Sequence, residues 1–263
     1  MRFNFLVVFL VCIACKKQAH HSIAIIGHAG NGLDIPTSFY APNSLESIEM
    51  ALGTPGIEGV ELDVQLSIDN ELWLYHDDLL EISTNGKGCI SNSTNEELKN
   101  VRYKTANQEK LTRLKDLNFE LYTNKTIYLD LRHYNGCAES IIEQSLFIDG
   151  LTPLIDQWPA VNFIIVTNHK QWLNGFSQSG LRVYCDIETM SEFDQLKNGN
   201  FSYEGVIIRN SACTKDDVAR IKHENKAVIL FDLRAPKSIR KAFEKTPSAI
   251  ITDDVKAALI EKS

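Results

Sequence analysis

The chain has 263 residues, of which 44% are hydrophobic and 23% are charged, and it carries a net charge of −7 at pH 7. This length and composition predict a single globular domain, close to the roughly 250 residues of a typical α/β barrel. The negative charge, with no run of lysines and arginines interleaved with aromatic residues, argues against nucleic acid as a partner.

The N-terminus has the order of an export signal. Met1-Arg2 and the apolar run 3–14 are too short for a bilayer anchor, and the run ends at Cys15, followed by two lysines. This resembles a bacterial lipoprotein signal, in which the cysteine is lipidated and becomes the new N-terminus. We therefore predict a signal peptide over residues 1–14, a tether over 15–21 and a globular domain over 22–263. The expected location is the bacterial cell envelope, with a lipid anchor in a membrane facing the periplasm or the cell surface. The alternatives are a plain signal peptide cut nearby and no processing.

Short strand-like runs alternate with helix-like segments along the rest of the chain. Nine runs have strand character: 22–27, a run around Glu61 and Asp63, 71–75, 126–132, 162–168, 181–187, 205–210, 227–233 and 248–253. Helical spacing appears at 44–52, 138–147, 214–225 and 237–244. Near-continuous Val, Ile and Leu strands alternating with helices are typical of a parallel sheet buried on both faces.

The nine strand-like runs are one more than an eight-stranded barrel needs. The link between Asp63 and Leu72 is too short for a helical crossover, so we expect one run near it to be irregular or accessory. A single-domain α/β fold of the TIM-type (β/α)8 barrel class is the prediction, with a doubly wound sheet as the alternative. There is no glycine-rich phosphate loop or dinucleotide fingerprint to support that alternative.

A pair of carboxylates marks the strand around residue 62. Glu61 and Asp63 are two residues apart and share one face, while Val60, Leu62 and Val64 point the other way. Two ionised groups side by side on an apolar strand repel each other unless a cation lies between them, and a hard divalent metal ion would serve. The alternative is an exposed edge strand with both carboxylates in solvent.

Other chemically useful side chains recur at the predicted carboxyl ends of strands. They are His28, His76, and Asp130 with Arg132. In a barrel these ends converge on one mouth, which favours the barrel over the doubly wound sheet.

The motifs together resemble the glycerophosphodiester phosphodiesterase family, within the larger group of barrels that includes phosphatidylinositol-specific phospholipases C. The resemblance rests on His28-Ala29-Gly30, Pro42-Asn43-Ser44, Glu61-Leu62-Asp63-Val64, His76-Asp77, Thr84-Asn85-Gly86-Lys87-Gly88, Asp130-Leu131-Arg132 and Thr252-Asp253, in this order. It implies a metal-dependent enzyme that hydrolyses glycerophosphodiesters, as small-molecule substrates, to glycerol phosphate and an alcohol.

The resemblance also implies roles for individual residues. Glu61, Asp63 and Asp130 are expected to hold a Ca²⁺ or Mg²⁺ ion, for which oxygen ligands are suited. His28 is expected to act as general base and His76 as the acid for the leaving alcohol.

Two residues are expected to contact the substrate, and two positions depart from the family's pattern. Arg132 and Asn43 are expected to contact the substrate, although Asn43 could instead cap the helix that follows it. Ala29 replaces the family's phosphate-binding arginine, so either Arg132 takes over that work or phosphate affinity falls. Asp130 replaces a glutamate. Two alternative functions therefore stay open: a lyase that forms a cyclic phosphate, and a non-catalytic phosphodiester-binding lipoprotein.

Four cysteines lie beyond Cys15, and they allow three disulfide pairings between which the sequence does not decide. They are Cys89, Cys137, Cys185 and Cys213.

Overall fold

The structure is a computed structural model that describes residues 22–33, 39–138 and 140–263. The predicted signal peptide 1–14, the lipidation site Cys15 and the tether 15–21 lie outside the described residues. Among the described residues, no helix is long and apolar enough to span a membrane.

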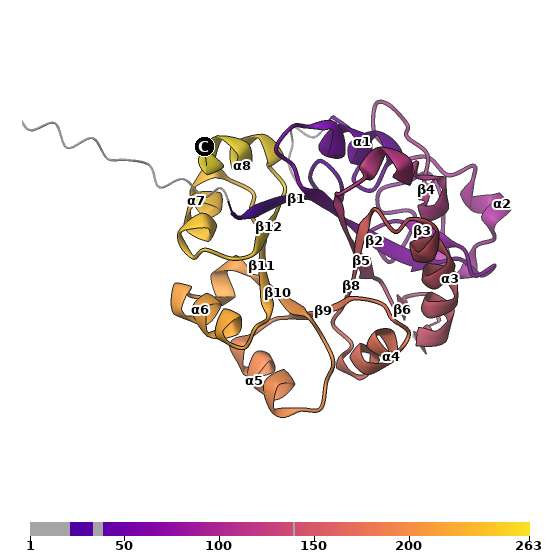
Figure 1. Cartoon of the computed structure of the whole chain (residues 1–263). Helices are drawn as coiled ribbons and strands as arrows, with labels where there is room; N and C mark the ends of the chain where they lie inside the picture. The colour runs from indigo at the N-terminus through magenta and orange to yellow at the C-terminus, as the bar shows by residue number, and fades with distance from the viewer. Residues whose placement is uncertain (1–21, 34–38, 139) are drawn as a thin grey trace, which may run out of the picture.

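Eight parallel strands form a closed barrel (Figure 1). Each pairs with its neighbour, and the first strand pairs with both the second and the last, which closes the ring. The strands are β1 (Ala24–His28), β2 (Gly59–Leu66), β5 (Thr126–Leu131), β8 (Asn162–Thr167), β9 (Val183–Ile187), β10 (Gly205–Arg209), β11 (Ala227–Phe231) and β12 (Ala249–Thr252). The prediction of a single-domain TIM-type barrel is confirmed.

Helices surround the barrel, as Figure 1 shows in a view down its axis. They are α1 (Leu45–Gly53), α2 (Asn95–Leu98), α3 (Gln144–Gln157), α4 (Leu173–Gln178), α5 (Met190–Asn198), α6 (Lys215–His223), α7 (Pro236–Glu244) and α8 (Val255–Lys262). Several begin at a side-chain cap that satisfies free backbone N–H groups: Thr189 and Thr214 each start a capping box, at α5 and α6.

The ninth strand run is accessory, as expected. It forms β3 (Leu72–Leu74), which pairs antiparallel with β2 and in turn with the two-residue strand β4 (Thr112–Arg113). The Tyr75 N–H donates to the Asp63 carbonyl at 3.0 Å. This bond holds the residue before His76 against β2, the strand that carries Glu61 and Asp63. The antiparallel strand β3 therefore brings His76 to the same end of the barrel as these carboxylates.

Alternation along the strands divides the core into two parts. Val60, Leu62 and Val64 belong to the large cluster between the barrel and its helices. A smaller cluster fills the barrel, built mainly from residues that point inward: Ile26, Tyr128, Ile164, Val166, Tyr184, Ile207, Ile229, Ala249 and Ile251. His28 ends β1 and Asp130 lies next to the end of β5, and strand register places Glu61 and Asp63 of β2 beside them.

A disulfide joins the segment after β3 to the segment after β5. Cys89 and Cys137 are bonded, with their Cα atoms 6.0 Å apart, whereas Cys185 and Cys213 are buried free thiols. This settles the pairing among the three that the sequence allowed.

The predicted helix at 138–147 is wrong in its placement. Strand β6 (Tyr134–Asn135) pairs antiparallel with β7 (Ser140–Ile141), and α3 begins only at Gln144. The disulfide at Cys137 ties this segment to a distant part of the chain. The helix then runs ten residues beyond the predicted end, because Phe147, Leu151 and Leu154 recur at helical spacing and are buried.

The disulfide should stabilise the fold. Because it closes a loop with a sequence separation of 48, we expect Cys89→Ser to lower the free energy of unfolding by about 2–4 kcal/mol. Guanidinium unfolding with and without a reductant measures this. Reductant should weaken the wild type and leave Cys89→Ser nearly unchanged; equal responses would show that the bond contributes nothing.

Candidate active site

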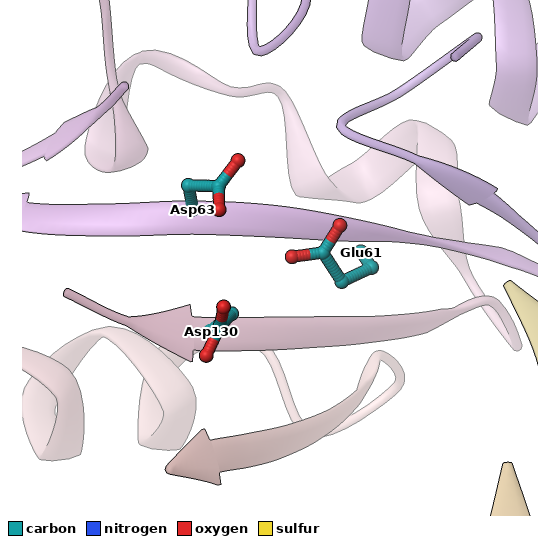
Figure 2. A group of neighbouring side chains, drawn as sticks. All are labelled: Glu61, Asp63 and Asp130. Atoms are coloured by element: carbon teal, nitrogen blue, oxygen red, sulfur yellow. The ribbon is translucent and has the colours of Figure 1, made fainter. Parts of the chain in front are cut away.

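Strand register brings the acidic residues and the first histidine together. His28 on β1 is paired with Glu61 on β2, and Asp63 on β2 is paired with Asp130 on β5. Figure 2 shows the three carboxylates projecting from these two neighbouring strands toward one space. The predicted group Glu61, Asp63 and Asp130 is thus assembled by the simple two-residue period of adjacent parallel strands.

The three carboxylates form one compact group. Each offers an oxygen, and these oxygens all lie within 4.8 Å of one another. Glu61 and Asp63 are buried, with side chains 6% and 0% exposed. At an effective dielectric constant of about 20, each pair of ionised carboxylates at such a separation repels by roughly 3–4 kcal/mol. The arrangement therefore calls for a compensating positive charge.

Arg132 supplies part of that charge. Its Nε donates to Asp63 Oδ1 at 2.8 Å, its Nη2 also donates to that oxygen, and Nη2 lies 3.4 Å from Asp130. Burial would raise the pKa of Asp63, but the charges of Arg132 and of the two histidines, together with the hydrogen bond from Asn43, outweigh it and lower the pKa. Burial, with the charge of Asp63, raises the pKa of Glu61 and that of Asp130. One arginine does not neutralise three acids.

Asn43 lies behind Asp63 and not in the cavity lining. It is fully buried, and its Nδ2 donates to Asp63 Oδ2 at 2.7 Å while its Oδ1 accepts from the Asp63 backbone N–H at 3.1 Å. The alternative that Asn43 caps the following helix is wrong, because the Ser44 side chain caps α1 by accepting from the Ser47 N–H. Asn43 instead orients the central carboxylate of the group.

The turn after β1 is tightly built around Ala29. This residue is fully buried with φ at +49°, and its N–H donates to Glu61 Oε2 at 3.2 Å. Gly30 follows with φ at +93°, and a Cβ there would lie 2.7 Å from Ser47 Oγ. An arginine at position 29 would have to displace the groups that enclose Ala29.

His28 is held by a carboxylate from the far end of the chain. Its Nδ1 lies 2.8 Å from Asp253 Oδ1, and its Nε2 lies 3.7 Å from Glu61 Oε2. Burial would lower the pKa of His28, but the hydrogen bond to Asp253 and the charge of Glu61 raise it to about 9. Asp253 belongs to the Thr252-Asp253 motif, yet the sequence did not reveal this role.

His76 has the same arrangement on the other side of the mouth. Its Nδ1 lies 3.0 Å from Asp77 Oδ1, and this hydrogen bond raises the pKa of His76. Asp77 is itself bound by Ser83 Oγ at 2.7 Å. Each imidazole is therefore oriented through Nδ1 by an aspartate, which leaves Nε2 for proton transfer.

A cavity of about 300 Å³ contains these groups at the mouth of the barrel. Its lining includes His28, Glu61, His76, Asp130 and Arg132, all of them predicted site residues. It also includes Asp232 and four polar residues whose place in the lining the sequence did not reveal: Asp186, Arg209, Arg234 and Asp253. Burial and the charge of Asp130 raise the pKa of Asp186 to about 7. Asp186, Arg209 and Arg234 lie at or after the ends of strands whose sequences carry no such motif, whereas Asp253 belongs to the Thr252-Asp253 motif.

The acidic group is suited to a divalent cation. Oxygens bound to a single Ca²⁺ at about 2.3–2.6 Å are at most about 5 Å apart, which agrees with the 4.8 Å limit of this group. Burial, and after it the charge of Asp63, keeps the pKa values of Glu61 and Asp130 raised in spite of Arg132. A carboxylate oxygen can accept from Arg132 or Asn43 and still offer a lone pair to a metal ion.

Comparison with known proteins assigns part of the chain to a family model. Residues 28–135 match the family model described as "Glycerophosphoryl diester phosphodiesterase family". The matched segment holds both histidines, the three carboxylates and Arg132. The match covers less than half of the chain, and this is the part that carries the predicted site.

Relatives and solved structures agree with the assignment. A "Glycerophosphodiester phosphodiesterase" of Bacillus altitudinis is 25% identical over 81% of this chain and 89% of its own. A protein of that name from Caldanaerobacter subterraneus subsp. tengcongensis is 34% identical, over 29% of each chain. That alignment spans less than a third of the relative's length.

Solved structures of the family share the fold over nearly their whole length. An Oleispira antarctica phosphodiesterase, solved in complex with the product sn-glycerol-3-phosphate, has a TM-score of 0.77 at 20% identity, covering 93% of this chain and 99% of that one. A glycerophosphodiester phosphodiesterase of Thermotoga maritima has a TM-score of 0.69 at 19% identity, covering 91% and 97%.

The contact between His28 and Asp253 should be visible in a titration. In protein stripped of metal, we expect nuclear magnetic resonance to give His28 a pKa of about 9. Asp253→Asn removes the strongest contact that raises this pKa, so the value should fall toward 6.5. Because folding raises the pKa of His28, its contribution to stability is fully present below pH 6.5 and is lost as the pH rises through 9. An unchanged His28 titration in Asp253→Asn would contradict this assignment.

Proposed function

We propose that this enzyme hydrolyses glycerophosphodiesters to glycerol phosphate and an alcohol, with a divalent metal ion held by Glu61, Asp63 and Asp130 and with His28 and His76 as the acid–base pair. The observation that carries the proposal is the pair of imidazoles, each oriented by an aspartate, that line one cavity together with the acidic group. Two histidines with independent orienting partners suit a reaction that removes one proton and delivers another.

The metal ion supplies charge neutralisation. A bound Ca²⁺ or Mg²⁺ would offset the negative charge that builds up on the phosphate oxygens during displacement. Glu61, Asp63 and Asp130 would hold it, with Asn43 and Arg132 keeping the Asp63 carboxylate in place.

The two histidines divide the proton transfers. We assign His28 as the general base toward water and His76 as the general acid toward the leaving alcohol. The base must be neutral, and a cation bound at the neighbouring Glu61 would lower the pKa of His28 and so favour its neutral form. His76 is 37% exposed and has a raised pKa, both of which suit a group that begins the reaction protonated and reaches the leaving group.

Product analysis tests the reaction class. Purified protein with added Ca²⁺ or Mg²⁺ should convert glycerophosphodiesters to glycerol phosphate, followed by phosphorus NMR, and a chelator should stop turnover. A cyclic phosphate as the final product would identify the lyase alternative. Binding without turnover would identify the non-catalytic alternative.

The acidic group and His76 should differ in their response to chelator. A metal ion that binds only the folded state stabilises it by mass action. Chelator should therefore lower the melting temperature of the wild type and of His76→Ala by the same amount, and that of Asp63→Asn much less. His76→Ala should lose turnover by roughly 10²-fold or more. Equal chelator effects on the wild type and Asp63→Asn would remove the metal site.

We also propose that the protein is anchored to a membrane through Cys15, which supports action near lipid-derived diesters. This rests on the sequence at residues 1–17. Cys15→Ser should move the protein from the membrane fraction to the soluble fraction, or leave an unprocessed precursor, as measured by fractionation and mass spectrometry. A wild type found wholly in the soluble exported fraction would overturn the anchor.

A further inference from the structure

The substrate phosphate has to enter a mouth rich in negative charge. Five carboxylates line the main cavity: Glu61, Asp130, Asp186, Asp232 and Asp253. The turn that carries an arginine elsewhere in the family carries Ala29 here, and Ala29 is fully buried. An anionic substrate therefore needs another cationic group in this cavity.

Arg132 alone does not supply the positive charge that phosphate binding needs. Two of its nitrogens are used by Asp63, and one of them also lies 3.4 Å from Asp130. The guanidinium is thus committed to holding the acidic group together. A second arginine on the opposite side would allow the phosphate to be bound from both sides.

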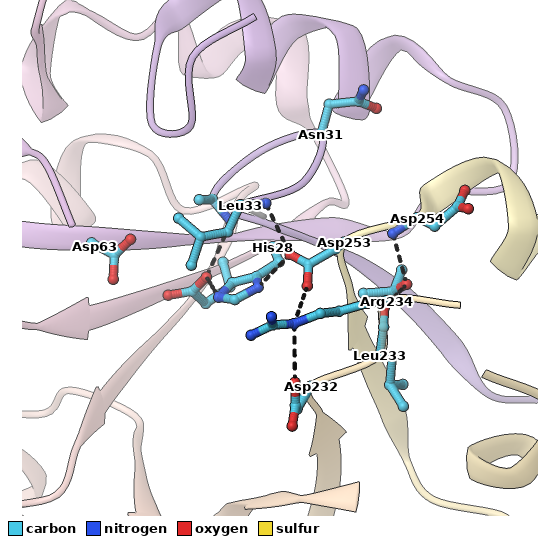
Figure 3. Close-up of polar contacts among 12 residues, drawn as sticks. His28, Asn31, Leu33, Asp63, Asp232, Leu233, Arg234, Asp253 and Asp254 are labelled. Atoms are coloured by element: carbon cyan, nitrogen blue, oxygen red, sulfur yellow. Dashed lines mark hydrogen bonds and ion pairs between the residues drawn. The ribbon is translucent and has the colours of Figure 1, made fainter. Parts of the chain in front are cut away.

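Arg234 occupies that opposite side. It lies three residues after the end of β11, its Nε is 3.2 Å from Asp232 Oδ1 and 3.7 Å from Asp253 Oδ2, and its side chain is 55% exposed. Figure 3 shows the side chain running past Asp253 toward His28. The two carboxylates contact Nε, which lies at the inner edge of the guanidinium, so they fix its direction.

Arg234 also lies where two cavities meet. A neighbouring cavity of about 380 Å³ is lined by Tyr75, Asp77, Ser83 and Tyr103 among others, and it shares Leu33, His76 and Arg234 with the main cavity. A phosphodiester has two arms joined at phosphorus. With one arm in each cavity, its phosphate would lie at this boundary, between the proposed acid His76 and Arg234.

We propose that Arg234 binds the substrate's phosphate group and takes the place of the arginine that position 29 lacks. The inference rests on the proposed phosphodiesterase function and adds the second phosphate-binding residue of that site. A guanidinium presents paired N–H donors that match two phosphate oxygens. Asp232 and Asp253 hold it in position before the substrate arrives, which lowers the entropic cost of binding.

The test compares Arg234→Ala with Arg240→Ala in full-length protein supplied with the divalent ion. Arg240 on α7 is a matched control, because it is 59% exposed, is paired with Glu261 at 2.8 Å and does not line the cavity. Steady-state kinetics on a glycerophosphodiester and calorimetric titration with sn-glycerol 3-phosphate are measured for both. Arg234→Ala should raise KM and the product's Kd by about tenfold with a smaller change in kcat, and Arg240→Ala should change each less than about twofold. Arg234→Lys, which keeps the charge without the fork, should recover part of the affinity.

Each outcome bears on a different claim. If kcat falls while KM and the product's Kd stay at wild-type values, Arg234 acts only by positioning Asp253 and His28, and the inference is overturned. Unchanged kinetics and product binding in Arg234→Ala also overturn it. A wild type that binds sn-glycerol 3-phosphate but turns over no diester contradicts the proposed function, while weaker product binding in Arg234→Ala would still support the phosphate contact.

Discussion

Repulsion among three carboxylates is the constraint on which the mouth of this barrel depends. Glu61, Asp63 and Asp130 project from two neighbouring strands above an apolar interior, where water cannot screen them well. Arg132 and the Asn43 amide bind the central carboxylate, and the Ala29 N–H binds Glu61. These contacts hold the group in place without neutralising it, and the remaining negative charge is what would attract a divalent cation.

The other charged residues of the mouth either orient the two histidines or oppose this negative charge. Asp253 and Asp77 orient one imidazole each, and the acidic surroundings keep both histidines readily protonated. Arg234 approaches from the strand opposite, held by Asp232 and Asp253. The disulfide between Cys89 and Cys137 ties the segment after β3 to the segment after β5. The affinity for an anionic substrate therefore depends on how far the cationic groups offset repulsion from the fixed carboxylates.

The sequence predicts those parts of the site that depend on neighbouring residues, and it misses those that depend on contacts between distant segments of the chain. Glu61 with Asp63, and the strands that carry His28 and Asp130, follow from a two-residue period and from the rule that parallel strand ends converge. The positions of Asn43, Asp253 and Arg234 do not, because each depends on a contact between segments distant in the chain: 20 residues separate Asn43 from Asp63, and 225 separate His28 from Asp253. The misplaced helix at 138–147 has the same origin, since the disulfide at Cys137 outweighs a local helical pattern. Local periodicity thus predicts the barrel and its acidic strand, and tertiary contacts decide which neighbours complete the site.

The central claim is that Glu61, Asp63 and Asp130 form one divalent-cation site. Its most direct test is a crystal structure of the protein soaked with Mn²⁺, which substitutes for Ca²⁺ or Mg²⁺ at oxygen-rich sites and gives an anomalous signal. The account predicts a single strong anomalous peak among these three carboxylates. A peak elsewhere in the mouth, or none at saturating Mn²⁺ with Arg132 still bridging Asp63 and Asp130, would contradict it.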